Sequence, residues 1–387
     1  MDTNTIAKPS WFQRFLLPGF AFKAVVIGGG YATGRELAEF FIPSGPWGGL
    51  IGILLAMMIW SLVCAITFAF ARLTQAYDYR SMFRQLLGPF WIIFEISYLL
   101  FMILILAVVA AAAGAIGEQV FGLPPMAGTL LLIAAIVGVT TFGNQGAEQL
   151  FKYGTTFIYV VYGVFLVLAI ASFGGLIGPA LTSGVPTDGW VVGGVTYASY
   201  NVVAVVAVLP FLRRATSQRD ALIAGALAGP LAMLPALIFF LCMAAFYPAI
   251  GAEALPSDFL LQRMGVPWFQ IVFQLMIFVA LLETGAGCVN AFNERIGEAM
   301  VDRGRPSLSP LGRLAIATPL LVGSAFGASQ IGLVDLIATG YGAFGYIMLV
   351  VFVLPIVTIG VARVVRSKAP PLGPAPEHGP VGEVARD

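Results

Sequence analysis

The first residues that could do chemistry form a glycine-rich stretch inside the first long apolar segment. It reads Gly28-Gly29-Gly30-Tyr31-Ala32-Thr33-Gly34 and is followed at once by Arg35 and Glu36. Glycine costs about 1 kcal/mol relative to alanine inside a helix, and a charge near the centre of a bilayer costs roughly 2.5–3.5 kcal/mol. Backbone that leaves the helix at this depth frees carbonyls for a cation and amides for an anion. We therefore expect a binding site here, although close helix packing would also use small residues.

A carboxyl group beside a hydroxyl group is the second candidate. It lies in a later apolar segment, which reads Glu283-Thr284-Gly285-Ala286-Gly287-Cys288. Ionisable side chains inside membrane helices are rare and mark functional sites by default. Glu283 could carry a coupling proton or pair with Arg35, and a structural ion pair or a protonated, hydrogen-bonded Glu is the alternative. We regard Glu283 as the strongest single functional side chain.

A third candidate group resembles the first in its order of residues. Here Gly193-Gly194 is followed by Tyr197-Ala198-Ser199-Tyr200-Asn201, as the earlier glycines are followed by Tyr31-Ala32-Thr33. Tyr200 could cap a substrate, while Ser199 and Asn201 could donate hydrogen bonds to it. Hydrogen bonds between helices are the alternative. Tyr98 is a weaker candidate for the lining of the same site.

Arg35 and Glu39 are spaced four residues apart, which on a helix places the two side chains on one face. They could therefore form a simple intrahelical ion pair. The depth of Arg35, a few residues outward of Gly30, would also suit a gate or a partner for a substrate carboxylate. Both interpretations stay open from the sequence.

The elements that must position these residues are membrane-spanning helices. Apolar residues make up 59% of the 387 residues and charged residues only 10%, against about 25% charged in a soluble domain. A span needs about 20 apolar residues. We count ten such runs, at 18–42, 47–71, 89–117, 126–144, 153–178, 190–212, 220–248, 267–300, 314–330 and 336–362. The segments 1–14 and 367–387 are expected to be a cytoplasmic N-terminal segment and a disordered cytoplasmic tail.

The positive charges support this count. Of the 20 Lys and Arg residues, all but Arg35 and Arg263 fall on one side of a ten-span topology. Cytoplasmic loops are enriched in Lys and Arg, so both termini are predicted to be cytoplasmic. We expect a multi-pass protein of a bacterial cytoplasmic (inner) membrane, in contact with the lipid bilayer.

The two glycine interruptions fall in runs one and six, which cross the membrane in opposite senses. Matching interruptions in two halves of a chain point to the site of an inverted-repeat transporter. We therefore divide the chain into a first five-helix repeat at 15–180 and a second at 188–363.

The pattern resembles the LeuT-like fold of the amino acid–polyamine–organocation superfamily, with five plus five helices and broken helices one and six. Residues Ala32-Thr33-Gly34-Arg35-Glu36, with Phe40-Phe41 after them, are similar to a motif of YkvI-type bacterial membrane proteins. This resemblance implies an ion site between helices one and eight, where Thr284 matches the hydroxyl ligand of a possible Na⁺ site and Gly287 lies nearby. It also implies an outer gate between Arg35 and Asp335. It implies a transporter role but no cargo.

The function predicted from these observations is secondary active transport of a small polar organic solute, such as an amino acid or derivative, coupled to Na⁺ or H⁺. The alternative is a membrane sensor or receptor subunit that binds without transport. An intramembrane enzyme is disfavoured because the single histidine, His378, lies in the tail and no His/Cys cluster is present in the sequence. We expect no cofactor beyond the coupling ion and no nucleic-acid partner, and the sequence carries no sign of oligomeric state.

Overall fold

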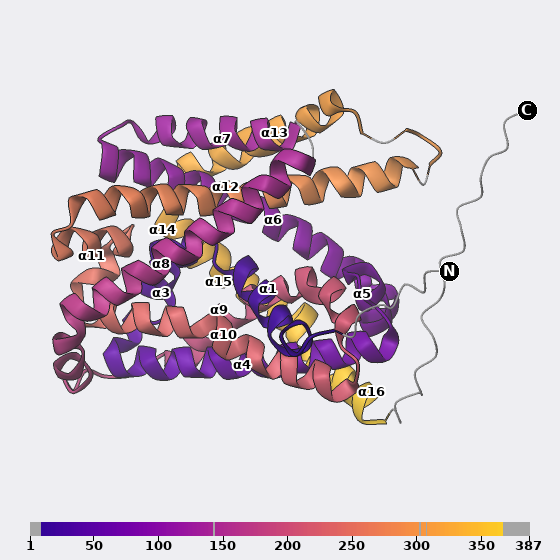
Figure 1. The fold of residues 1–387 in the computed structure, drawn as a ribbon, viewed down its shortest axis with the longest axis horizontal. Coiled ribbons are helices and arrows are strands. Elements are labelled where there is room, and N and C mark those ends of the chain that lie inside the picture. Colours follow the sequence, from indigo (N-terminus) through magenta and orange to yellow (C-terminus); the bar gives the residue numbers. More distant parts are fainter. Residues whose placement is uncertain (1–8, 142–143, 302, 307, 367–387) are drawn as a thin grey trace, which may run out of the picture.

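The computed structural model describes residues 9–141, 144–301, 303–306 and 308–366, and the regular elements within these ranges are helices. The long helices lie side by side along the long axis of the molecule (Figure 1). We call the end that carries α5 (Tyr79–Leu87) and α16 (Val361–Arg366) the terminal end, and the end that carries α11 (Pro256–Met264) the far end. The predicted tail at 367–387 and the first eight residues of the predicted N-terminal segment lie outside the described residues.

Eight helices of the described residues are long and apolar enough to cross a membrane. They are Arg35–Thr74, Tyr79–Phe121, Tyr153–Leu181, Trp190–Arg214, Gln218–Ala244, Pro267–Gly297, Pro310–Ile331 and Leu333–Arg366. The predicted fourth span corresponds to α7, a shorter apolar helix at Pro125–Thr141. The predicted first span is divided into short pieces. Eight spans therefore meet the length criterion where the sequence predicted ten.

The first predicted span is interrupted twice. Helix α1 (Leu17–Val26) ends before Gly28, whose backbone is extended with φ −98° and ψ −170°. Helix α2 (Gly29–Thr33) then ends at Gly34, which has φ +79°, and α3 (Arg35–Phe40) follows. A Cβ on Gly34 would lie 2.7 Å from the ring of Phe239, so both the backbone conformation and the space require glycine there.

The second interruption is of a different kind. Helix α9 (Trp190–Asn201) passes directly into the 3₁₀ helix η4 (Val202–Arg214), and Asn201 keeps helical backbone angles of φ −71° and ψ −30°. The sequence predicted a broken helix here, whereas the chain changes its helix type without an extended residue. The physical reason is local: valines, not glycines, follow Asn201. Trp60 fixes the end of α9 by donating a hydrogen bond to the carbonyl of Ala198 at 3.1 Å.

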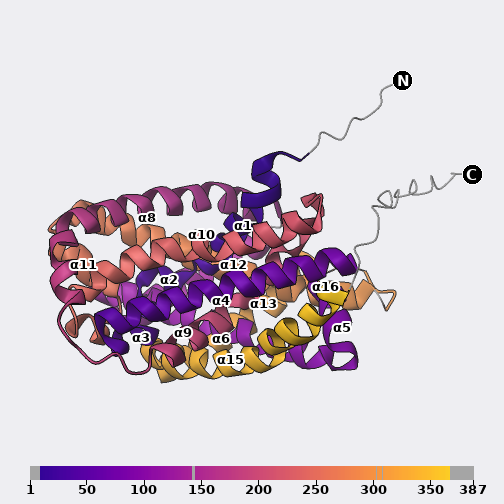
Figure 2. The same cartoon turned by 90° about the horizontal axis from the view of Figure 1, so that it is seen from below.

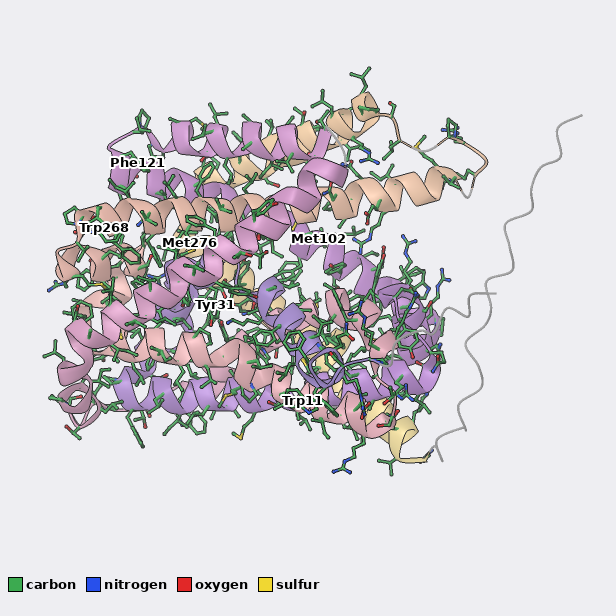
Figure 3. The ribbon with its side chains drawn as sticks, viewed as in Figure 1. Trp11, Tyr31, Met102, Phe121, Trp268 and Met276 are labelled. Atoms are coloured by element: carbon green, nitrogen blue, oxygen red, sulfur yellow. The ribbon has the colours of Figure 1, made fainter. Side chains whose placement is uncertain are left out.

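The short first-span helices lie between two groups of long helices. Helices α7, α12 and α13 lie on one side of α1 in Figure 1, and α4 and α10 lie on the other. Figure 2 shows α8 along one face of the molecule and α15 along the opposite face. In Figure 3, Tyr31 lies near the middle of the bundle, while Trp268 and Phe121 lie at the far end. The remaining α-helices are α4 Gly45–Thr74, α6 Trp91–Phe121, α8 Asn144–Leu181, α10 Gln218–Ala244, α12 Pro267–Val301, α13 Pro310–Ile331, α14 Leu333–Asp335 and α15 Gly342–Met348. The remaining 3₁₀ and π helices are η1 Phe12–Leu16, η2 Ile42–Ser44, η3 Gly88–Phe90, η5 Ala249–Ala252, η6 Leu336–Tyr341, η7 Leu349–Val353 and η8 Ile356–Gly360.

Candidate functional site

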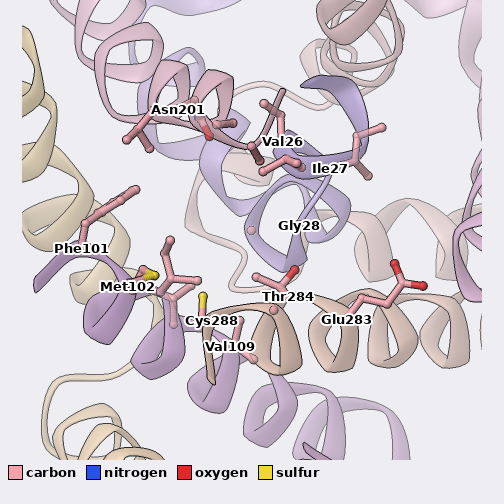
Figure 4. A pocket seen from close by; sticks show the side chains of 18 of the residues that line it. Val26, Ile27, Gly28, Phe101, Met102, Val109, Asn201, Glu283, Thr284 and Cys288 are labelled. Carbon is pink, nitrogen blue, oxygen red and sulfur yellow. The ribbon is translucent and has the colours of Figure 1, made fainter. Parts of the chain in front are cut away.

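A cavity of about 470 Å³ lies where the first interruption meets α6, η4 and α12. Figure 4 shows Gly28 and Thr284 near its middle, with Asn201 and Phe101 toward one end and Glu283 toward the other. Most of the wall is aliphatic or aromatic, and its carboxylates are Glu36 and Glu283. The cavity therefore has two chemically distinct polar ends, which we call the Glu36 end and the Glu283 end.

Glu36 is buried, with 5% of its surface exposed, and is held by residues of α9. The hydroxyl of Tyr200 donates a hydrogen bond to Oε2 of Glu36 at 2.8 Å, and Nδ2 of Asn201 donates to the same oxygen at 3.4 Å. The other oxygen, Oε1, lies against Gly30, where any Cβ would collide with it. The carboxylate is thus fixed over the start of α2 by close approach on one side and hydrogen bonds on the other.

An aromatic cluster closes the cavity at the Glu36 end. It consists of Phe40, Phe101, Tyr200, Tyr341 and Phe344, with ring centroids 4.8 Å apart for Tyr200 and Tyr341 and 5.7 Å apart for Phe101 and Tyr341. Phe101, Tyr200 and Tyr341 line the cavity and are buried.

Other lining residues lie on the accessible surface of the protein. Ala24 and Val25 of α1, Ala207 of η4 and Gly287 of α12 are exposed. The cavity is therefore closed at the aromatic cluster and open between α1, η4 and α12.

At the Glu283 end, the carboxylate lies on the unbroken helix α12 and faces α8. Its Oε2 accepts a hydrogen bond from the hydroxyl of Thr155 at 3.4 Å. Its Oε1 is buried against Gly154 and has no hydrogen-bond partner within the described part of the chain. A buried carboxylate oxygen without a partner is costly, so this end is suited to a bound cation or proton.

Thr284 faces the first interruption. Its hydroxyl donates to the carbonyl of Ala280 at 2.9 Å, and its Oγ1 lies 3.4 Å from the position that a Cβ on Gly28 would take. Figure 4 shows the Thr284 hydroxyl directed toward Gly28. A hydroxyl oxygen and irregular backbone thus lie close to each other in the cavity, and ion binding between these two segments stays a prediction.

Several predicted binding residues stabilise the interruption and do not line the cavity. The Tyr31 hydroxyl donates to the carbonyl of Ala232 on α10 at 3.0 Å, and the Thr33 hydroxyl donates to the carbonyl of Gly30 at 3.0 Å. The Ser199 hydroxyl donates within its own helix, to the carbonyl of Val195 at 2.7 Å. Ala32 is buried and Gly34 forms the turn described above, while the surroundings of Gly29 lie outside the described part of the structure. Of the predicted substrate-binding residues, Gly28, Gly30, Tyr98, Tyr200 and Asn201 line the cavity.

The predicted gate residues are distributed differently from the expectation. Arg35 is 3% exposed and pairs with Glu39 at 2.6 Å, and its guanidinium also donates to the carbonyls of Gly251 and Glu253 at 2.9 and 2.8 Å. Asp335 is exposed at the end of α14. The intrahelical ion pair is therefore the arrangement observed, and Arg35 binds the loop that follows α10 instead of facing the cavity.

Four further residues line the cavity that residue types and spacing did not predict for the binding site, namely Glu36, Phe101, Thr155 and Tyr341. From the sequence, Glu36 is only a charge beside Arg35 or a possible acid partner of Glu283. In one regular helix, six residues separate Gly30 from Glu36 by about 9 Å along the axis. The left-handed turn at Gly34 folds the carboxylate back onto Gly30, and residue spacing gave no signal of that turn.

The chain is similar in sequence to a bacterial membrane protein. It is 27% identical over 335 residues to the uncharacterized membrane protein YkvI of Bacillus subtilis (strain 168), a match that covers 85% of this chain and 92% of that protein. The chain is a distant homologue of YkvI. No protein-family model matches it.

Solved structures show the same fold. A Na⁺-coupled sialic acid symporter matches with a TM-score of 0.60 at 15% identity, over 91% of this chain and 82% of that one. MhsT in complex with L-phenylalanine matches with a TM-score of 0.56 at 14% identity, over 92% and 97%. A manganese transporter of Eremococcus coleocola matches with a TM-score of 0.53 at 15% identity, over 92% and 80%. The chain therefore has the LeuT-like fold of these transporters, and identities this low establish the fold alone.

Proposed function

We propose that this protein is a secondary active transporter of a small organic solute, coupled to Na⁺ or H⁺. The observation that carries the proposal is the cavity of about 470 Å³ built on an interrupted helix in the middle of a membrane bundle. Cavities of this size suit small organic ligands, and discontinuous helices form the substrate and ion sites of many transporters. The finer topology of ten spans, arranged as a five-plus-five inverted repeat with cytoplasmic termini, is part of this proposal.

The two ends of the cavity have different roles in the proposed cycle. The Glu283 end, with Thr284 and the backbone at Gly28, binds the coupling cation or proton. The Glu36 end, with Tyr200 and Asn201, binds the solute. Since the two ends share one space, a bound ion stabilises the same broken segment that contacts the solute.

The direction of opening gives the conformational state. The cavity is open between α1, η4 and α12, and it is closed by the aromatic cluster. With both termini in the cytoplasm this is an inward-facing state. To reach the outward-facing state, the rings of the aromatic cluster must separate, and α1 must close against η4 and α12.

Solid-supported-membrane electrophysiology on proteoliposomes tests the proposal. Amino acids, amines and nucleobases are added in turn, with and without Na⁺ and with a pH step, and labelled uptake is measured for any solute that gives no current. A solute-dependent flux that needs Na⁺ or a proton gradient supports coupled transport. Binding of a solute without flux in either assay would instead support a sensor subunit of the same fold.

A further inference from the structure

We propose that the solute is an organic cation, a protonated amine with a hydrophobic body, whose ammonium group binds at the Glu36 carboxylate. This inference rests on the proposed function and narrows its substrate class. It departs from the amino-acid expectation, because an amino acid brings a carboxylate into the same cavity.

The charges around the cavity support a cation. Two carboxylates and no Lys or Arg are among the described residues that line it. The nearby cations are not among these lining residues: Arg35 pairs with Glu39 and loop carbonyls, and Nζ of Lys23 lies 4.7 Å from the ring centre of Tyr159. The guanidinium carbon of Arg295 lies 4.8 Å from the ring centre of Tyr98, and its Nε lies 3.6 Å from the carboxylate of Glu95, while its Nη1 is buried without a hydrogen-bond partner. Among the described lining residues a solute carboxylate therefore has no cationic partner, whereas an ammonium group has a carboxylate partner.

The interruption itself already holds a carboxylate. Broken helices of LeuT-type transporters direct the start of a half-helix at the anionic group of the substrate. In this protein Oε1 of Glu36 lies against Gly30, at the start of α2. A carboxylate of the protein itself therefore lies at the interruption, and a substrate carboxylate at this end would come close to it.

The wall around Glu36 suits an apolar body more than a bare metal ion. Phe101, Met102, Ile105 and Tyr341 line the cavity on this side. Aromatic faces attract ammonium groups, and aliphatic side chains bury hydrocarbon. Inorganic divalent cations need several oxygen ligands, and no group of three His, Cys, Asp or Glu side chains that could hold a metal occurs in the part of the chain described.

Binding to matched solutes tests the inference. The full chain, purified in nanodiscs, is titrated by calorimetry with 2-phenylethylamine, L-phenylalanine and 2-phenylethanol, and with 3-methylbutylamine, L-leucine and 3-methylbutanol. Within each set the amino acid adds an α-carboxylate to the amine, and the alcohol removes the positive charge. We expect at least one amine to bind about tenfold or more tightly than both of its partners. MnCl₂ is included as the inorganic competitor.

The variant Glu36→Gln keeps the size of the side chain and an oxygen that can accept from Tyr200. We expect it to weaken amine binding roughly tenfold to a hundredfold, as for the loss of a charge-assisted hydrogen bond. The matched control is Glu118→Gln, which removes an exposed carboxylate from the far end of α6. The control should leave the amine affinity within about twofold, as is usual for surface substitutions.

Three results would overturn the inference: an amino acid that binds as tightly as its amine, a panel in which no amine binds, or unchanged amine affinity in Glu36→Gln. Manganese binding that displaces the amines would also count against it. These outcomes are separate from failure of the proposed function. Amine binding without flux would contradict the transporter function but support the proposed class of ligand. Coupled flux of leucine would support the transporter function but contradict the proposed class of ligand. The wild-type panel needs no variant, so a poorly folding Glu36→Gln protein does not prevent the test.

Discussion

The two carboxylates at the ends of the cavity differ in how the chain holds them. Glu36 belongs to the broken first segment, where Tyr200 and Asn201 donate to one of its oxygens and Gly30 contacts the other. Glu283 belongs to the unbroken helix α12, where Oε1 is buried without a partner within the described residues. Two donors and a close glycine hold the Glu36 carboxylate in one position, which pre-organises it for one recurring ligand geometry. One donor holds Glu283, and its buried, unpaired oxygen is suited to an ion or proton that binds and is released.

The difference follows from the helices. The interruption at Gly28 and Gly34 frees the backbone to fold Glu36 over α2. Helix α12 has no such interruption near Glu283, so this side chain keeps the direction that a regular helix gives it, toward Thr155 on α8. Helical regularity thus leaves Glu283 less completely paired than the irregular segment leaves Glu36.

The largest expected effect is that of Glu283→Gln on coupled transport. Glutamine cannot supply the charge or the proton site, so we expect gradient-driven uptake in proteoliposomes to fall by about a hundredfold or more. Solute affinity measured by calorimetry without the coupling ion should change by less than about threefold, since Glu36 and its partners are untouched. The increase in affinity that the bound ion gives the wild type should be lost in this variant.

Glu118→Gln is again the matched control for the loss of one carboxylate. The division between the two ends would be wrong if Glu283→Gln kept coupled uptake. It would also be wrong if this variant lost solute affinity to the same degree as Glu36→Gln, because the two carboxylates would then act as one site.

How much of the site could be predicted depends on whether a residue stays on one regular helix. The positions of Glu283 and Thr284 could be predicted, because depth along an uninterrupted apolar run can be counted from its ends. The pair of Arg35 and Glu39 followed from a spacing of four residues. The all-helical membrane protein followed from composition, and the LeuT-like fold implied by the resemblance is shared with the solved structures. The predicted break in the sixth run was wrong, because α9 passes directly into η4.

Contacts that depend on turns or on distant segments could not be predicted in this way. The position of Glu36 depends on the backbone at Gly34, and that of Tyr341 depends on how the last segment packs against α6 and α9. The nature of the second interruption was also beyond the sequence argument. Glycines at 193 and 194 predicted a break, yet they serve close packing, since a Cβ on Gly194 would lie 2.7 Å from the carbonyl oxygen of Gly52.

A smaller effect is expected for Gly30→Ala. The added Cβ would collide with Oε1 of Glu36 and displace the carboxylate from its hydrogen bonds with Tyr200 and Asn201. We expect solute affinity to fall about tenfold by calorimetry, while helix propensity alone would slightly favour alanine. Unchanged affinity would show that the contact between Gly30 and Glu36 does not position the carboxylate.

The control for this glycine is Gly163→Ala on α8, where an added Cβ meets no atom within 4 Å. Gly163 does not line the cavity. Solute affinity in this variant should stay within about twofold of the wild type, since nothing must move. A comparable loss in both alanine variants would point to a general effect of rigid helices and not to the Glu36 carboxylate.

The smallest effect is expected for Asp335→Asn, and it bears on a third charged region, outside both ends of the cavity. Arg35 pairs with Glu39 and donates to the carbonyls of Gly251 and Glu253, while Asp335 is exposed. We therefore expect Asp335→Asn to change uptake by less than about twofold, as exposed substitutions usually do. Glu39→Gln is the variant to compare with Asp335→Asn. It leaves the buried Arg35 charge without its carboxylate partner and should therefore lower the melting temperature of the protein. A loss of uptake in Asp335→Asn with an unchanged melting temperature would instead mean that Arg35 exchanges Glu39 for Asp335 in another state, and the predicted outer gate would then rest on that exchange.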